Sequence, residues 1–133
     1  MKKRKILDSS ALLRFFSCGK GYELIEKELE IAQKEEQKIL LNLINLGEIY
    51  YAVKNKFNKE TAEKTLEFIN NLPISICLAS KEVILRAADL KSDFGIPFVD
   101  AICAASAIIE NATILTCDFD FKKVSSEVEI IWV

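Results

Sequence analysis

Four carboxylates are set apart by their surroundings from the rest of the chain's 20 acidic residues. Asp8 and Asp118 each stand just past a short apolar run of the kind that forms a buried strand. Glu48 lies inside an apolar stretch at helical spacing, and Asp100 begins an almost entirely apolar helix. The chain has no histidine, which excludes imidazole general bases, Ser-His-Asp and Cys-His catalysis, and histidine zinc sites. Catalysis would therefore rest on carboxylates, lysines, hydroxyls or thiols.

Carboxylates in apolar surroundings need a cation, because burying an unpaired carboxylate costs several kcal/mol. Glu48 has no lysine or arginine within one helical turn, and Lys54 is the nearest. A cation shared by several acids would meet this need. Sites made only of oxygen ligands suit Mg²⁺ or Mn²⁺ rather than zinc. Such an ion polarises a phosphate oxygen and activates water, which is the chemistry of phosphodiester hydrolysis.

Three of the four acids also have a purely structural explanation, which the residues alone leave open. Asp8 is placed to cap the following helix, and Asp118 to cap a turn together with Asp120. Asp100 lies at a helix N-terminus, where a negative charge favours the helix dipole. Glu48 differs, since a residue in the middle of a helix has no capping role.

Short apolar runs alternate with amphipathic segments along the chain. The runs predict strands at 5–7, 39–41, 74–78, 113–116 and 128–132, and the segments predict helices at 9–16, 22–36, 46–57, 61–70, from 80 onward and at 98–110. This alternation is typical of a parallel α/β sheet with helices on both faces. Because the carboxyl ends of parallel strands meet at one edge, we expect Asp8 and Asp118 to lie together there.

The composition indicates one domain over residues 1–133. Half of the residues are hydrophobic, and only 6 are glycine or proline, so a core can form and a disordered chain is excluded. The longest apolar run, Ala101 to Ile109, is too short to span a membrane. Four scattered cysteines without a C-x-x-C pair indicate small buried side chains rather than ligands. We expect a cytoplasmic protein without a membrane segment.

Four blocks of sequence, taken together and in this order, resemble the PIN-domain nucleases, and most closely the VapC-type toxins of prokaryotic toxin–antitoxin pairs. The blocks are Ile6-Leu7-Asp8-Ser9-Ser10-Ala11-Leu12, Ile44-Asn45-Leu46-Gly47-Glu48-Ile49-Tyr50-Tyr51, Pro97-Phe98-Val99-Asp100-Ala101 and Thr116-Cys117-Asp118-Phe119-Asp120-Phe121. The resemblance covers essentially the whole chain. It implies a three-layer α/β/α fold with a short central parallel sheet, and a metal-dependent endoribonuclease that acts on structured RNA.

The resemblance also implies a site. Asp8, Glu48, Asp100 and Asp118 match the four acids with which the family coordinates Mg²⁺ or Mn²⁺, and Asp120 matches an additional, peripheral acid. In the implied arrangement Asp8, Asp100 and Asp118 hold one ion, while Glu48 completes its surroundings or positions water. Two hydroxyl positions also match, and they are expected to hold waters or the carboxylates. These are Ser10 and Thr116.

Partners follow from charge and from the family. Lys54 and Lys56, beyond Glu48 on the same helix, are candidates to contact RNA phosphates together with Lys2 to Lys5, although a solvated helix end is the simpler explanation of them. The family implies a homodimer and a cognate antitoxin whose segment packs across the groove. Four aromatic residues at helical spacing are expected mostly in the core, the alternative being an interaction surface. They are Tyr50, Tyr51, Phe57 and Phe68.

The acids that follow the strands also distinguish this interpretation from three other functions. A receiver-type phosphoacceptor would need an acidic pair after the first strand and a lysine near the last strands. A haloacid-dehalogenase-type phosphatase would need Asp-x-Asp, where this chain has Ser10. The stronger alternative is a non-catalytic PIN-like module that binds RNA or protein. Such a module is expected to lack one or more of the four acids, and all four are present.

Overall fold

The computed structural model describes residues 3–133 and contains a five-stranded parallel sheet. The strand order is β3-β2-β1-β4-β5, so the first strand is central. Pairing of Leu7 with Leu41 on one side and with Leu115 on the other sets the register. The strands are β1 (Arg4–Leu7), β2 (Ile39–Asn42), β3 (Ile74–Cys77), β4 (Ala112–Thr116) and β5 (Ile130–Trp132).

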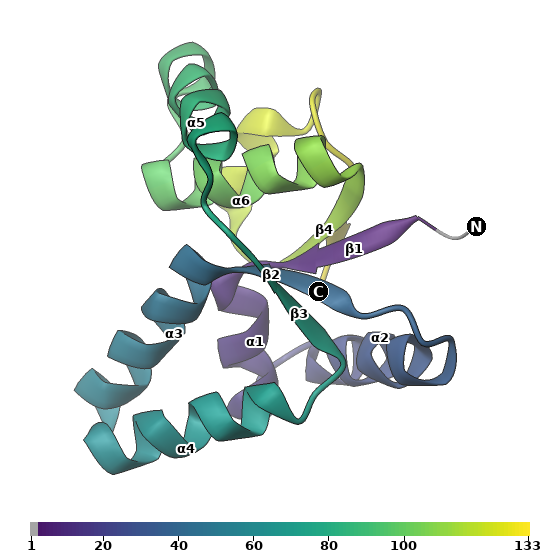
Figure 1. The fold of residues 1–133 in the computed structure, drawn as a ribbon, viewed down its shortest axis with the longest axis vertical. Coiled ribbons are helices and arrows are strands. Elements are labelled where there is room, and N and C mark those ends of the chain that lie inside the picture. The colour runs from purple at the N-terminus through teal and green to yellow at the C-terminus, as the bar shows by residue number, and fades with distance from the viewer. Residues whose placement is uncertain (1–2) are drawn as a thin grey trace.

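Helices cover both faces of the sheet, which gives the expected three layers (Figure 1). One face carries α1 (Ser9–Phe16), α2 (Tyr22–Lys34), α3 (Leu43–Lys56) and α4 (Lys59–Asn70). The other face carries α5 (Lys81–Phe94), α6 (Phe98–Glu110) and the 3₁₀ helix η1 (Phe119–Val124). Each face has its own hydrophobic cluster, because alternate residues of β1, β2 and β4 point to opposite sides. Ile6 belongs to one cluster and Leu7 to the other.

The expected strands and helices are all present, with differences at their ends. The helix predicted to begin at residue 46 begins at Leu43, because Asn42 caps it by accepting a hydrogen bond from the Ile44 amide at 2.9 Å. Asn58 caps α4 and Ser80 caps α5, each by accepting a hydrogen bond from a backbone amide. The last strand is shorter than predicted and begins at Ile130. The short helix η1 was not predicted, and it begins directly after Asp118.

The expectation that four aromatic residues in α3, in α4 and in the turn between them lie mostly in the core is wrong for three of them. Tyr51 is 55% exposed, Phe57 62% and Phe68 49%, while Tyr50 packs partly against the core. The two helices form a hairpin that extends outward from the sheet (Figure 1). Only one stripe of each helix can face the core, so the remaining aromatic rings stay at the surface.

Two further expectations concern the cysteines and the membrane. Cys103 is buried as expected, whereas Cys77 and Cys117 are half-buried and Cys18 is exposed. Within residues 3–133 no single helix is long and apolar enough to cross a membrane. One bent pair of helices, α5 and α6, meets the requirement on the grounds of length and composition alone. Lys2, part of the expected basic segment, lies outside the described residues.

Candidate functional site

The four acids approach one another at the carboxyl edge of the sheet. Asp8 follows β1 and Asp118 follows β4, and these two strands are neighbours. Helix α3, which follows β2, carries Glu48, and the first turn of α6 carries Asp100. The fold therefore places the ends of two strands and two helices around one point, as expected for ligand sites in parallel α/β sheets.

Asp8 is the most buried of these acids, with 2% of its surface exposed. Its carboxylate accepts hydrogen bonds from the hydroxyls of Ser10 and Thr116, each at 2.8 Å. It also accepts one from the Ala11 amide at 3.0 Å, which makes it the N-cap of α1. The capping explanation and a role in the site are thus compatible. The two hydroxyls singled out in the sequence hold this carboxylate in place.

Asp100, Asp118 and Asp120 form a close acidic group. One carboxylate oxygen from each of the three lies within 4.8 Å of the other two. Asp118 caps η1 by accepting a hydrogen bond from the Asp120 amide at 2.9 Å, and its own amide donates to the Thr116 hydroxyl at 3.0 Å. Asp120, expected at the periphery, is therefore drawn into the group by the turn at Asp118. Asp8 and Glu48 lie outside this close triad.

The pKa values connect Asp8 and Glu48 to the triad. Burial, followed by the charges of Asp118, Asp8 and Glu48, raises the pKa of Asp100 from 3.8 to about 8. Burial also raises the pKa of Asp8 to about 6, against the opposing effect of its hydrogen bonds. Neighbouring acids thus make ionisation of Asp8 and Asp100 harder. The four carboxylates predicted from the sequence act on one another electrostatically.

Glu48 is held by two residues that the sequence analysis did not single out. The hydroxyl of Ser9 donates to Glu48 Oε1 at 2.7 Å, and the side-chain amide of Asn45 donates to the same oxygen at 3.1 Å. Asn45 is 1% exposed, and its Oδ1 is buried without a hydrogen-bond donor among the described residues. Asn45 lies one helical turn before Glu48, a spacing at which side chains meet, so a signal for it was present in the sequence.

Positive charge is scarce around these acids. Among residues 3–133 no lysine or arginine forms an ion pair with Asp8, Glu48, Asp100 or Asp118. Lys123 pairs with Asp120 at 3.5 Å, and both side chains are nearly half exposed. Asp8, Glu48, Asp100 and Asp118 have no paired cation among the described residues, and burial and neighbouring acids raise the pKa of Asp8 and Asp100, so the group has the donor chemistry of a divalent metal site. Oxygen-only ligands of this kind fit Mg²⁺ or Mn²⁺.

The predicted RNA-contacting lysines lie at the end of α3. Both Lys54 and Lys56 are exposed, and among the described residues neither forms an ion pair. Lys56 lines a groove between α1, α3 and α4 that also includes Ser10, whereas Lys54 does not line it. The groove therefore reaches one of the residues that hold Asp8.

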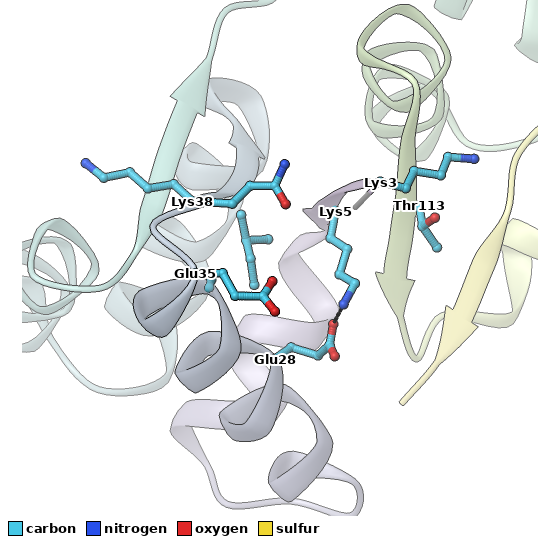
Figure 2. Close-up of a pocket in the computed structure, with 9 residues that line it drawn as sticks. Lys3, Lys5, Glu28, Glu35, Lys38 and Thr113 are labelled. Carbon is cyan, nitrogen blue, oxygen red and sulfur yellow. Dashed lines mark ion pairs between the residues drawn. The ribbon is translucent and has the colours of Figure 1, made fainter. Parts of the chain in front are cut away.

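A cavity of about 250 Å³, smaller than the groove of about 750 Å³, lies at the opposite, amino-terminal edge of the sheet (Figure 2). Its lining mixes both charges, and Lys5 forms an ion pair with Glu28 inside it. An acid that already has a cation from the chain has no need of a metal ion. This cavity is therefore not a second candidate metal site.

Comparison with solved structures finds the same fold in toxin–antitoxin proteins. A VapBC complex of Rickettsia felis, bound to a DNA fragment from its promoter, matches with a TM-score of 0.76 and 22% identity over 96% of this chain and 97% of that one. A DNA-bound VapBC of Salmonella typhimurium matches with a TM-score of 0.76 and 11% identity over 98% of both chains. A Mycobacterium tuberculosis VapC, described as a toxin that cleaves the sarcin–ricin loop, matches with a TM-score of 0.73 and 16% identity over 94% and 97%.

Comparison with curated proteins finds no match. The family model of the PIN domain, in contrast, matches residues 5–127, a span that contains all five acids of the site. The order of the elements, the acidic group at the carboxyl edge and this match lead to one assignment: the chain belongs to the PIN domain family.

Proposed function

We propose that this chain is a metal-dependent endoribonuclease that hydrolyses RNA phosphodiester bonds, and that it is the toxin of a VapBC-type toxin–antitoxin pair. The observation that carries the proposal is the group of carboxylates at the carboxyl edge of a PIN domain, in which burial and neighbouring acids raise the pKa of Asp100 and none of Asp8, Glu48, Asp100 and Asp118 has a paired cation among the described residues. Folding such a group costs stability, because burial and neighbouring charges hinder the ionisation of Asp8 and Asp100. A cost of this kind is typical of a functional site.

The metal site proposed is made of Asp8, Glu48, Asp100 and Asp118, with Asp120 at its edge. When bound, Mg²⁺ or Mn²⁺ supplies polarisation of a phosphate oxygen and a more acidic water. The negative charge of the acids is what retains the ion, and the ion's charge in turn allows a polyanionic RNA to approach them. Since ligands bind metal when deprotonated, the raised pKa of Asp100 makes metal affinity increase with pH through about 8.

The chain's own residues supply the positioning. Ser10 and Thr116 hold the Asp8 carboxylate, and Asp118 is held by its capping bond to the Asp120 amide. Both hydrogen bonds to Glu48 go to Oε1, which leaves Oε2 without a partner among the described residues. Glu48 would then complete the surroundings of a bound ion or orient the water that attacks phosphorus. As that water bonds to phosphorus, the bond from phosphorus to the leaving oxygen of the RNA would break, with the water's proton passing to solvent and the leaving oxygen taking a proton from solvent.

RNA binding and protein partners complete the proposal. Lys54 and Lys56 contact phosphates of the substrate, because both are exposed cations on the helix that carries Glu48. The chain acts in the cytoplasm as a homodimer and is inhibited by a cognate antitoxin. VapBC complexes among the structural neighbours support an antitoxin partner. A basic side chain of that antitoxin would meet the acids of the site.

The test is cleavage of total RNA by the purified protein in Mn²⁺, in Mg²⁺ and in a chelator. The variant Asp100→Asn, purified in the same way, excludes a contaminating ribonuclease, and Asp93→Asn on the surface of α5 is the matched control. We expect metal-dependent cleavage by the wild type and by Asp93→Asn, and a loss of at least about 100-fold in Asp100→Asn. Cleavage that survives in Asp100→Asn or in chelator would contradict the proposal.

Melting temperatures separate the remaining outcomes. Metal that stabilises the wild type but not Asp100→Asn supports the site, even where total RNA holds too little of the preferred substrate to show cleavage. Absence of both cleavage and a metal effect would favour the alternative, a non-catalytic PIN-like module that binds RNA or protein.

A further inference from the structure

Phe119 and Trp132 form a pair of aromatic rings at the surface, beside the acids. The centroids of the two rings lie 5.7 Å apart, with an angle of 32° between their planes. Phe119 is 70% exposed, more than any other large apolar side chain among the described residues, and Trp132 is 38% exposed. A single exposed apolar side chain is ordinary, whereas two large rings exposed together call for an explanation.

Packing of the fold does not explain the exposed ring of Phe119. The 3₁₀ helix η1 is anchored by Phe121 and Val124, which are both fully buried in the cluster under α5 and α6. Phe119 lies two residues before Phe121 in the same short helix and belongs to neither hydrophobic cluster. One phenylalanine of η1 therefore holds the helix on the core, and the other is free to meet a ligand.

The backbone places this ring pair next to the proposed metal site. Phe119 lies in the chain between Asp118 and Asp120, whose carboxylates belong to the close triad. Trp132 pairs across the sheet with Thr116, whose hydroxyl accepts a hydrogen bond from the Asp118 amide at 3.0 Å. Both rings are thus carried by segments that also position the acids, and a molecule bound to the rings would lie beside the metal site.

The ring pair is separate from the groove between α1, α3 and α4. Side chains alternate along β5, so Ile130 and Trp132 point to the face of the sheet that carries α6 and η1. Ile131 points to the opposite face, where its strand partner Leu115 packs under α1 to α4. The acids are therefore accessible from a second surface, which no helix of the groove contributes to.

Positive charge accompanies the rings. The Nζ of Lys122 lies 4.9 Å from the centroid of the Phe119 ring, a distance at which an ammonium is attracted to the ring face. Lys122 forms no ion pair among residues 3–133, whereas the neighbouring Lys123 pairs with Asp120. A ligand that combines a flat apolar group with a negative charge matches this surface.

We propose that Phe119 and Trp132 hold one base of the substrate RNA, in a nucleotide beside the scissile phosphate, and that Lys122 binds the phosphate of that nucleotide. The inference rests on the proposed function and assigns to it specificity-determining residues. Exposed aromatic rings stack on nucleobases, and a nearby cation neutralises the backbone. The RNA is then positioned over the acids by a base as well as by its charge.

The size and charge of the surface favour a nucleotide over a protein. A stable protein interface takes about 20–30 residues a side, whereas this surface consists of two rings, with Ile131 turned to the other face of the sheet. A second copy related by two-fold symmetry would set Lys122 against Lys122. A single flat, negatively charged group meets neither difficulty.

Trp132 makes the test direct, because it is the only tryptophan of the chain. Its fluorescence is recorded by rapid mixing in Mg²⁺, before cleavage proceeds, while the anisotropy of labelled RNA reports binding anywhere on the protein. The probes are a short unstructured RNA and an oligomer with the same ribose–phosphate backbone but no bases. We expect the RNA to quench Trp132, and the oligomer without bases to bind more weakly and leave the fluorescence unchanged.

Variants of Phe119 separate stacking from a structural role. Phe119→Ala should bind the RNA about tenfold more weakly, while its affinity for the oligomer without bases stays that of the wild type. Phe119→Tyr keeps a ring and should restore binding, and Tyr51→Ala, an exposed ring on α3, is the matched control. The rise in melting temperature with Mg²⁺ should be the same in Phe119→Ala as in the wild type, because Asp118 and Asp120 stay in place.

Several results would overturn the proposal. RNA that fails to bind, or that binds without quenching Trp132, would do so, as would equal losses for the two probes in Phe119→Ala. A smaller Mg²⁺ effect on melting in Phe119→Ala would assign the ring a structural role at the acids. Light scattering that shows a dimer in the wild type and a monomer in Phe119→Ala, with RNA binding unchanged, would assign the ring pair to a second copy.

The outcome is distinguishable from that of the cleavage test. Metal-dependent cleavage that is indifferent to Phe119→Ala, with no quenching of Trp132, would leave the nuclease in place and remove the ring pair from it. Quenching of Trp132 that depends on Phe119 and on the bases, without cleavage under any condition, would retain the nucleotide site and remove the nuclease.

Discussion

The acids at the two edges of the sheet have opposite kinds of neighbours. At the amino edge three acids pair with cations of the chain: Lys5 pairs with Glu28 (Figure 2), Arg4 with Glu110 at 3.0 Å, and Lys3 with Glu129 at 3.3 Å. At the carboxyl edge four acids meet one another. Hydrogen bonding to Lys3 lowers the pKa of Glu129, whereas burial and neighbouring acids raise that of Asp100.

This difference distinguishes charged residues that stabilise the fold in ion pairs from charged residues that are available to a ligand. Ion pairs of the amino edge are complete within the chain and need no further partner. The acids of the carboxyl edge lack a full set of positive partners, since the described residues form no ion pair with Asp8, Glu48, Asp100 or Asp118. Evolution retains such a destabilising arrangement where activity requires it. A variant of a paired acid at the amino edge is therefore a suitable control for a variant of an acid at the carboxyl edge.

The largest expected effect is on cleavage and compares one acid from each edge. Asp118→Asn should reduce metal-dependent RNA cleavage by at least about 100-fold, because a ligand of the proposed metal loses its charge. Glu28→Gln, which removes an acid that already has Lys5 as partner, should leave cleavage unchanged. Single-turnover cleavage rates measure both. Equal losses in the two variants would erase the distinction between the edges.

A smaller effect is expected from the residues that hold Glu48. Ser9→Ala and Asn45→Ala should each raise the Mn²⁺ concentration needed for half-maximal cleavage by about tenfold, because Glu48 loses a hydrogen bond that orients it. Ser9→Thr keeps the hydroxyl and should behave like the wild type. A metal requirement that stays constant while only the melting temperature falls would assign both residues a structural role alone.

The smallest effect is on stability, and its sign follows from the raised pKa values. Asp8 binds its proton more tightly in the folded than in the unfolded chain, with pKa values of about 6 and 3.8, and Asp100 does so up to about 8. Stability of the metal-free protein is therefore greatest below about pH 4 for these groups and is lost as the pH rises through 6 and 8.

Thermal unfolding between pH 4 and pH 8 measures this slope. Asp8→Asn should flatten it, and Glu129→Gln should not, because the pKa of Glu129 is lowered rather than raised. Saturating Mn²⁺ should also flatten the slope, since an ion favours the ionised carboxylates. A metal-free stability that increases over this range would contradict the contrast between the edges.

Much of the fold follows from local patterns. The apolar runs and amphipathic segments place all five strands and six α-helices, and Asn58 and Ser80 are recognisable caps. Boundaries at Asn42 and Asp118 were less accessible, because an N-cap is decided by where the chain turns as well as by its residue type. The 3₁₀ helix η1 has too few residues to show a period.

The exposure of the α3–α4 hairpin shows where sequence patterns mislead. Tyr51, Phe57 and Phe68 have the spacing of core residues, yet the hairpin extends outward from the sheet and only one stripe of each helix is covered. Hydrophobic periodicity identifies an apolar face without saying whether another element packs against it. The groove beside these rings is therefore a property of the assembled helices.

By itself, the sequence determined which acids stand apart and on which edge the strands would bring Asp8 and Asp118, because parallel strands end on the same side. The tertiary structure decided how the acids meet. Asp120 joins the close triad, Asp8 lies outside it and accepts hydrogen bonds from two hydroxyls, and Ser9 and Asn45 donate hydrogen bonds to Glu48. The physical reason is distance. Electrostatic coupling and hydrogen bonding depend on separations of a few ångströms between residues far apart in the chain, and only packing sets those separations.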